Sequence, residues 1–274
     1  MKPISFYKMN GSGNDFIIID NRSGMAPEGL PEFVRGVCRR KLSVGADGLI
    51  LIEAHSRHDF KWQFFNADGS RAEMCGNGAR CAARFAFLHG IAGARMAFGT
   101  DAGTIEAEVI GEDVKIKITD PFDLRCDYTI ALEAGKQTVS SVNTGVPHVV
   151  IETERLEEAP VVTTGHEIRY HSQFAPAGTN VNFVAVRKSG AIGGRTYERG
   201  VEDETLACGT GCVAAALITA LRHAWDSPIA VTTKSGGILT IHFQREKQSF
   251  RSVYLEGDAR IVYAAELQAD ALEP

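Results

Sequence analysis

The chain has 274 residues, of which 44% are hydrophobic and 23% charged, and a formal net charge of −5. This composition is typical of a globular protein, and the length suits one large domain or two ordinary ones. The acidic balance gives no electrostatic basis for binding nucleic acid or an anionic membrane. The N-terminus lacks the apolar core of a secretory signal, and the longest helix-like uncharged run, 208–221, is too short to span a membrane. We therefore expect a cytoplasmic protein without nucleic-acid or membrane partners.

In chain order, short strands bounded by turn residues are predicted at 15–20, 48–53 and 61–66, followed by a hairpin with arms 104–110 and 114–118. Later strands are predicted at 182–187, 228–233, 237–243 and 252–257. A last strand at 260–263 could return to the first half of the chain, and the sequence does not decide this.

Two Ala-rich segments, running from Gly78 to about Gly90 and from Gly211 to about Asp226, are predicted helices. Both are nearly apolar around their circumference, which indicates central helices wrapped by sheet. Each follows the pattern Cys-Gly-x-Gly, beginning at Cys75 and Cys208, about half the chain apart. The repeat predicts an α+β fold of two pseudo-symmetric lobes, each a mostly antiparallel sheet around a central helix. The lobes are placed at 1–120 and 121–274, with 260–274 able to pack on the first.

Six cysteines, at positions 38, 75, 81, 126, 208 and 212, include no CxxC pair and no zinc-ligand spacing. We expect free thiols, as in a reducing cytosol, and no metal. Four of them are predicted to be small buried hydrophobes: Cys38, Cys81, Cys126 and Cys212.

The remaining two cysteines, Cys75 and Cys208, are candidates for catalysis. Glycines let the backbone approach a ligand closely, and the free N–H groups at a helix start bind anions such as a carboxylate. The same field lowers the pKa of a neighbouring thiol. If the two copies face one another across the lobe interface, one thiolate removes the α-proton of a bound amino acid and the opposing thiol protonates the other face. Inversion of a stereocentre requires two such groups, so Cys75 and Cys208 are predicted to catalyse a cofactor-independent epimerisation.

Four segments carry a family resemblance: FYKMNGSGNDFIIID, FFNADGSRAEMCGNGARCAA, GTNVNFV and YERGVEDETLACGTGCVAAAL. In this order they resemble diaminopimelate epimerase along almost the whole chain. The resemblance implies interconversion of LL- and meso-diaminopimelate, for lysine and peptidoglycan biosynthesis. It also implies two catalytic cysteines, no pyridoxal phosphate or metal, and a homodimer.

Matched to the family motifs, Cys75 and Cys208 are the catalytic cysteines. The resemblance implies that these residues bind substrate: Asn14, Asn66, Gly76, Asn77, Asn180, Glu198, Arg199, Gly209 and Thr210. Arg199 can clamp a carboxylate through two parallel hydrogen bonds, and Glu198 can accept from an ammonium group. His148 matches a family histidine near the reacting centre, with a purely structural histidine as the alternative.

For some of these residues, a purely structural role is the alternative. Asn14 and Asn66 could form turns beside strands, and Glu198-Arg199 could be an exposed charged pair. The chain also departs from the family at Val146, where an asparagine is common, and at Gly48, where some members carry glutamine. Both departures affect expected substrate contacts rather than the chemistry.

Three other functions are the alternatives. A two-cysteine proline or hydroxyproline racemase typically carries histidine in place of Asn77 and has little use for Glu198-Arg199. A non-catalytic amino-acid-binding protein would require neither thiol. A thiol-disulfide redox protein would normally carry its cysteines as CxxC.

Overall fold

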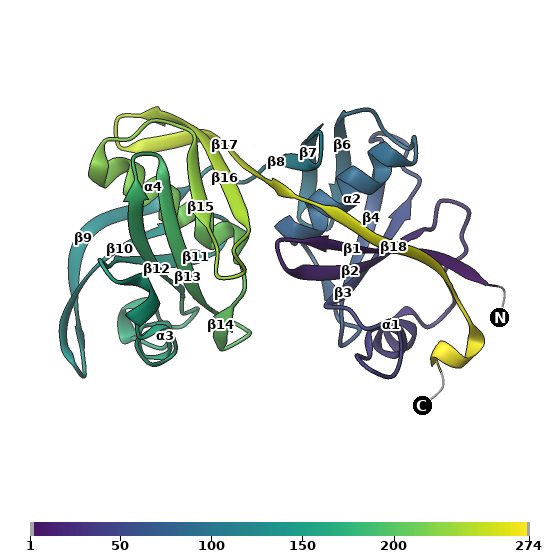
Figure 1. Cartoon of the computed structure of the whole chain (residues 1–274), viewed down its shortest axis with the longest axis horizontal. Helices are drawn as coiled ribbons and strands as arrows, with labels where there is room; N and C mark the ends of the chain where they lie inside the picture. Colours follow the sequence, from purple (N-terminus) through teal and green to yellow (C-terminus); the bar gives the residue numbers. More distant parts are fainter. Residues whose placement is uncertain (1–2, 273–274) are drawn as a thin grey trace. The chain divides into compact units, whose positions relative to one another are not determined.

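A computed structural model describes residues 3–272 (Figure 1). The chain divides into two compact units. The first unit comprises the chain up to Ile116 together with the segment from Gly257 onward, and the second runs from Lys117 to Glu256. Among residues 3–272, no helix is long and apolar enough to cross a membrane.

The first unit contains one sheet. Its strands lie in the order β18 (Arg260–Leu267), β1 (Ile4–Gly11), β2 (Asn14–Asp20), β3 (Gly48–Glu53), β4 (Phe60–Asn66), β6 (Arg95–Thr100), β7 (Gly103–Ile110) and β8 (Asp113–Lys117). The short β5 (Arg71–Ala72) pairs with β4. The pairs β2–β3 and β4–β6 are parallel, and the other pairs are antiparallel.

The second unit repeats this arrangement strand for strand. Its sheet runs β9 (Phe122–Leu132), β10 (Gly135–Asn143), β11 (Pro147–Glu152), β12 (Asn180–Lys188), β13 (Ala191–Glu198), β15 (Ile229–Thr232), β16 (Ile238–Glu246) and β17 (Ser249–Asp258). The short β14 (Asp203–Thr205) pairs with β13, and the parallel pairs are β11–β12 and β13–β15. The predicted pseudo-symmetric α+β fold is confirmed.

Each sheet curves around one helix (Figure 1). In the first unit α2 (Gly76–Leu88) packs on β1, β2, β3 and β7, and in the second α4 (Gly209–His223) packs on β10 to β13, β15 and β16. Every α4 residue from Gly211 to Ala220 is buried. Alanine lets the backbone of such a helix lie close to the surrounding strands without sacrificing helix propensity. The expected central buried helices are therefore present.

Shorter helices cover the outer faces of the sheets. The helix α1 (Leu30–Cys38) packs on β3 and β4 in the first unit, and α3 (Val161–Arg169) packs on β12 and β13 in the second. Three 3-10 helices complete the described structure: η1 (Leu156–Glu158), η2 (Ser172–Phe174) and η3 (Ala269–Leu272). The crossover helices connect the parallel pairs β2–β3 and β11–β12, a connection that parallel strands require.

The prediction for Cys126 was wrong. Cys38, Cys81 and Cys212 are buried as expected, whereas Cys126 is exposed. It lies on β9, an outer strand whose register against β10 shifts twice and whose residues Asp123 and Asp127 have positive φ. These irregularities break the alternation of inward and outward side chains, so a small apolar residue here does not point into a core.

Gly48 opens β3 at a point of close packing. It pairs with Phe16 of β2 and Asn66 of β4. A Cβ atom at this position would lie 2.5 Å from the carbonyl oxygen of Phe65 and 2.7 Å from the Phe64 ring. The family departure from glutamine at Gly48 therefore has a packing reason, because the adjacent strand leaves no room for a side chain.

We expect Gly48→Ala to destabilise the fold by about 1–3 kcal/mol, the usual range for overpacking a well-filled core. Urea unfolding measures the change in free energy. Gly93→Ala is the control, since its Cβ would meet only the Arg95 carbonyl oxygen at 3.7 Å, an ordinary contact. Equal stability of the two variants would contradict the packing assigned to β3 and β4.

Candidate active site

Both cysteines of the repeat lie directly before a central helix. Cys75 is the N-cap of α2 with φ −147° and ψ 120°, and Cys208 is the N-cap of α4 with φ −119° and ψ 110°. Neither side chain caps its helix by a hydrogen bond. The first N–H groups of a helix have no partner within it and carry partial positive charge. Each cysteine thus adjoins a ready-made site for an anion.

The second glycine of each motif allows the helix start to approach the sheet. A Cβ atom on Gly78 would lie 3.2 Å from Ile50 and 3.4 Å from Trp62, tighter than most real contacts. A Cβ atom on Gly211 would collide with the side-chain oxygen of Asn182. The spacing Cys-Gly-x-Gly therefore fixes the distance from each thiol to the strands beneath it.

In the first unit, an acceptor faces the thiol. The Sγ of Cys75 lies 3.6 Å from Oδ1 of Asn14, which also accepts from Nδ2 of Asn77 at 3.4 Å. The orientation of the Asn14 amide is set by its Nδ2, which donates to the Asp47 carboxylate at 2.6 Å. Asn14 is thus a neighbour of the thiol and not simply a turn residue.

A buried arginine orients Asn77. Arg80 is 0% exposed, and its Nη2 donates to Oδ1 of Asn77 at 2.9 Å and to Oγ of Ser12 at 2.8 Å. Its Nε donates to the backbone carbonyl of Asp258 at 3.3 Å. Four residues of this network are not among the predicted site residues: Arg80, Ser12, Asp47 and Asp258. A buried charge inside an apolar helix was the available signal for Arg80, because such groups are almost always paired and hydrogen-bonded.

Asn66 lies at the end of β4, where its Nδ2 donates to Oγ of Ser70 at 3.0 Å within a turn. Its main chain pairs with Gly48, next to Asp47. The side chain is exposed. The side chain of Asn66 is therefore held within its own turn, and its main chain is joined to the strand that follows Asp47.

In the second unit, a hydroxyl faces the thiol. The Sγ of Cys208 lies 3.6 Å from Oγ1 of Thr210, which contacts Nε2 of His148 at 3.0 Å. His148 lies on β11 and is 1% exposed. Burial, together with the charge of Arg199, lowers the pKa of His148 to about 3. The imidazole is therefore neutral near pH 7.

The remaining predicted ligands of the second unit adjoin this group. Asn180 pairs with His148 across β11 and β12, and its Oδ1 accepts from the backbone N–H of Arg199 at 2.9 Å. Nη1 of Arg199 donates to the carbonyl of Ala177 at 3.1 Å. Glu198 ends β13, and burial raises the pKa of its carboxyl group. The interpretation of Glu198-Arg199 as an exposed pair is wrong, since both are partly buried.

Burial is the main influence on the pKa values of the buried thiols. It raises the pKa of Cys208 above its ordinary value, the negative charge of Glu198 adds to this, and the Thr210 hydroxyl and the Gly211 N–H oppose it. Burial, with smaller contributions from nearby charges, raises the pKa of Cys38 and of Cys81 to about 12. Those two thiols stay protonated near pH 7 and are packing residues.

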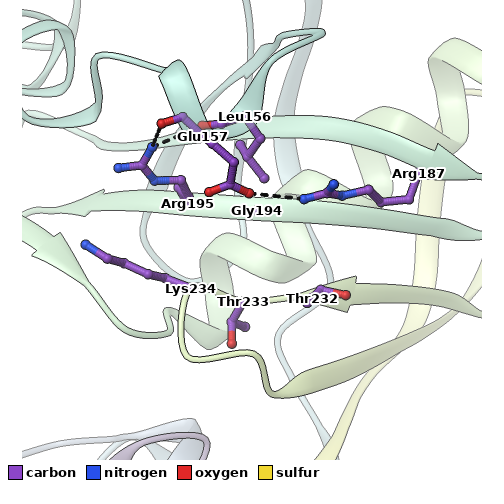
Figure 2. A pocket seen from close by; sticks show the side chains of 8 residues that line it. All are labelled: Leu156, Glu157, Arg187, Gly194, Arg195, Thr232, Thr233 and Lys234. Carbon is purple, nitrogen blue, oxygen red and sulfur yellow. Dashed lines mark hydrogen bonds and ion pairs between the residues drawn. The ribbon is translucent and has the colours of Figure 1, made fainter.

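A separate cavity of about 240 Å³ in the second unit lies between η1 and the strands β13 and β15 (Figure 2). The arginine and lysine side chains that line it are paired with carboxylates. Arg195 donates to both oxygens of Glu204 at 2.7 and 2.8 Å, Lys234 contacts the same group at 2.6 Å, and Arg187 faces Glu157 at 3.3 Å. Neither Cys75 nor Cys208 lines this cavity, and its charged side chains are engaged in ion pairs. It is therefore not the candidate active site.

Comparison with known proteins identifies the family of the chain. A family model described as diaminopimelate epimerase matches residues 6–121 and 140–262. A diaminopimelate epimerase from Aquifex aeolicus is 45% identical and aligns with 98% of this chain and 100% of its own length.

Solved structures share the fold at low identity. A phenazine biosynthesis protein of the PhzF family from Bacillus anthracis superposes with a TM-score of 0.75 at 15% identity, covering 98% of this chain and 100% of its own. A probable proline racemase from Agrobacterium radiobacter K84 superposes with a TM-score of 0.70 at 14% identity, covering 99% and 94%. These likenesses concern the fold alone, whereas the sequence match extends through both cysteine motifs. The chain belongs to the diaminopimelate epimerase family.

Proposed function

We propose that this chain is an isomerase that interconverts LL- and meso-diaminopimelate by a two-base mechanism, with Cys75 and Cys208 as acid and base. One observation carries the proposal: a cysteine directly precedes each of two buried helices that occupy equivalent places in a duplicated fold. Binding alone would require neither thiol. The family membership supplies the substrate, because the related Aquifex aeolicus protein is named a diaminopimelate epimerase.

The reaction balances with these two groups alone. A thiolate takes the proton from the α-carbon, the C–H bond breaks, and its electron pair spreads into the adjacent carboxylate. The opposing thiol then gives its proton to the other face of the carbon, which inverts the centre. Each turnover exchanges the protonation states of the two sulfurs. We therefore propose that neither pyridoxal phosphate nor a metal takes part.

The helix N-termini suit the carboxylate that must hold this charge. We propose that the backbone N–H groups of Gly76, Asn77, Gly209 and Thr210 bind it, because unpaired helix N–H groups stabilise an anion that grows during the reaction. We assign recognition of the rest of the substrate to Asn14, Asn66, Asn180, Glu198 and Arg199. The raised pKa of the Glu198 carboxyl would fall when an ammonium group binds beside it.

Proline and hydroxyproline racemases are the alternative on this fold, as the likeness to the probable proline racemase illustrates. Asn77, which hydrogen-bonds both Asn14 and Arg80, stands where those enzymes typically carry histidine. A cyclic imino acid also has no second carboxylate for Arg199. Both features favour the diamino diacid.

We also propose that the enzyme is a cytoplasmic homodimer. A reducing compartment fits six cysteines that are all free. For dimerisation, β18 leaves Val262 59% and Tyr263 42% exposed, and the residues from Arg260 to Glu266 lie largely at the surface on both sides of the strand. Apolar groups exposed together on one strand are typical of an interface.

The first test concerns the two thiols. We expect Cys75→Ala and Cys208→Ala each to lower epimerisation by about 10²–10⁴-fold, the usual contribution of a general acid or base. Proton NMR of LL-diaminopimelate in D2O measures both loss of the α-proton signal and appearance of the meso isomer. Cys126→Ala, at an exposed thiol of β9, should retain full activity. Near-native turnover by either single variant would rule out two bases.

The second test concerns the distal carboxylate. Arg199→Lys keeps the charge and loses the two-pronged guanidinium. We expect kcat/KM for diaminopimelate to fall roughly ten- to hundredfold. This corresponds to a loss of about 1.5–3 kcal/mol in transition-state stabilisation. Arg187→Lys, at an exposed ion pair on the same unit, is the matched control. An unchanged kcat/KM would place Arg199 outside the site. Lysine, which lacks the second carboxylate, should be a poor substrate.

The third test concerns assembly. We expect Tyr263→Glu to shift the protein from dimer to monomer, because a carboxylate would have to be desolvated in the interface. Analytical ultracentrifugation measures the mass in solution. Val201→Glu, at a residue 58% exposed in the second unit, should leave the mass unchanged. A dimer that survives Tyr263→Glu would show that β18 is not the interface.

A further inference from the structure

A chain of hydrogen bonds in the second unit leads from the buried sheet to the catalytic sulfur. Nδ2 of Asn182 lies 3.1 Å from Nδ1 of His148, Nε2 of His148 lies 3.0 Å from Oγ1 of Thr210, and that oxygen lies 3.6 Å from Sγ of Cys208. Asn182 and His148 are each 1% exposed. Their hydrogen bonds therefore form away from solvent, where the donor and acceptor of each contact must match.

The first link has a fixed direction. Nδ2 of Asn182 also lies 2.9 Å from the backbone carbonyl of Val149, which can only accept, so the atom facing it must be the amide nitrogen. On the other side of the amide, Oδ1 accepts from the Thr196 hydroxyl at 2.9 Å. A reversed amide would place Oδ1 against the Val149 carbonyl, with no hydrogen between the two oxygens, so the Val149 contact fixes the orientation. The amide therefore presents an N–H group to Nδ1 of His148.

This donor selects the tautomer of His148. Because Nδ1 accepts from Asn182, the proton of the neutral imidazole lies on Nε2, and Nε2 donates to Oγ1 of Thr210. The hydroxyl of Thr210 then keeps its own hydrogen for another acceptor. A thiolate can only accept, and Sγ of Cys208 is in reach.

We infer that Asn182 is a positioning residue that, through the tautomer of His148, directs the Thr210 hydroxyl to donate to the Cys208 thiolate. This inference rests on the proposed function for the meaning of the thiolate, although the chain itself is a property of the free protein. The family resemblance implies a supporting role for His148 at the site and implies no role for Asn182.

The hydrogen-bond chain favours a Cys208 thiolate that the rest of its surroundings disfavour. Burial and the charge of Glu198 disfavour the Cys208 thiolate, and Cys212 of the same helix adds to this effect. The Thr210 hydroxyl and the Gly211 N–H are the groups that favour it. The charge of Arg199 lowers the pKa of His148 further and helps to keep the imidazole neutral. Since a protonated imidazole would also donate from Nδ1, the neutral form is needed for Asn182 to act.

The helix motif brings these parts together. Gly211 opens the first turn of α4 against the Asn182 side chain, and a Cβ atom there would collide with Oδ1 of Asn182 and lie 3.2 Å from Sγ of Cys208. Because the second glycine of the motif has no side chain, the thiol and the Asn182 amide can both lie close to this residue.

Asn182→Asp tests the direction of the chain. An aspartate of the same shape offers an acceptor to Nδ1, so the proton of His148 should move to Nδ1, and Nε2 should accept from Thr210. Long-range ¹H–¹⁵N correlation spectra of ¹⁵N-histidine-labelled protein identify the tautomer. We expect the Nε2–H form in the unsubstituted protein and loss of that form in Asn182→Asp. An Nδ1–H form in the unsubstituted protein would overturn the inference.

The rate at which iodoacetamide alkylates Cys208, followed by peptide mass mapping across pH in a Cys75→Ser background, reports the thiolate. We expect Asn182→Asp and Thr210→Val to move the profile to higher pH, with a rate about tenfold lower below its midpoint, equivalent to about one pKa unit. Thr210→Ser should restore the profile. Adding Asn182→Asp to Thr210→Val should have no further effect, because the link is already broken.

Asn143→Asp is the matched control, since its Oδ1 already accepts from the Gly145 N–H and an aspartate can do the same. Folded variants with lower melting temperatures but unmoved alkylation profiles would assign Asn182 a structural role and overturn the inference. If Asn182→Asp does not fold, Thr210→Val with its serine rescue decides the matter. Failure of the unsubstituted protein to exchange the α-proton of diaminopimelate would instead refute the proposed function and leave the profile intact.

Discussion

The structure depends on two helices that are buried along their sides and begin at a cysteine. The small side chains of α2 and α4 allow a curved sheet to close around each helix, which leaves the helix N-terminus as the polar end of an apolar core. Four N–H groups at such an end need partners that the helix cannot supply. The fold thereby creates an anion site beside each thiol, and the second glycine of each motif sets how deeply that site lies.

Duplication of the fold has not made the two thiols alike. Cys75 faces the amide oxygen of Asn14, whereas Cys208 faces a hydroxyl that is itself held by His148. Around Cys208, burial and the charge of Glu198 raise the pKa of the thiol, and the Thr210 hydroxyl and the Gly211 N–H oppose them. A two-base epimerase needs one thiol and one thiolate at the start of every turnover. The equivalent positions come from equivalent helices, and the chemical difference comes from the side chains around each thiol.

Much of the fold was predictable where the signal is local. The strands at 15–20, 48–53 and 61–66 and the two central helices follow from short runs of apolar residues and from Ala-rich segments. Elements of the structure that were not predicted include β1, β6, β9, β10, β11, β13, α1 and α3. For β9 and α3, the irregular strand and the modest apolar content of the helix leave no clear period. The same irregularity explains why Cys126 is exposed.

The sequence by itself determined the cysteine pair, the helices they precede and the family, since each is written in a few consecutive residues. Tertiary structure alone decided that β18 joins the first unit, beside β1, in the place that β9 takes beside β10. It alone connected Arg80 with Asp258 and His148 with Thr210. The partners in these contacts are separated by dozens of residues or more. Their pairing follows from strand order and from the need to satisfy buried polar groups, neither of which has a local pattern.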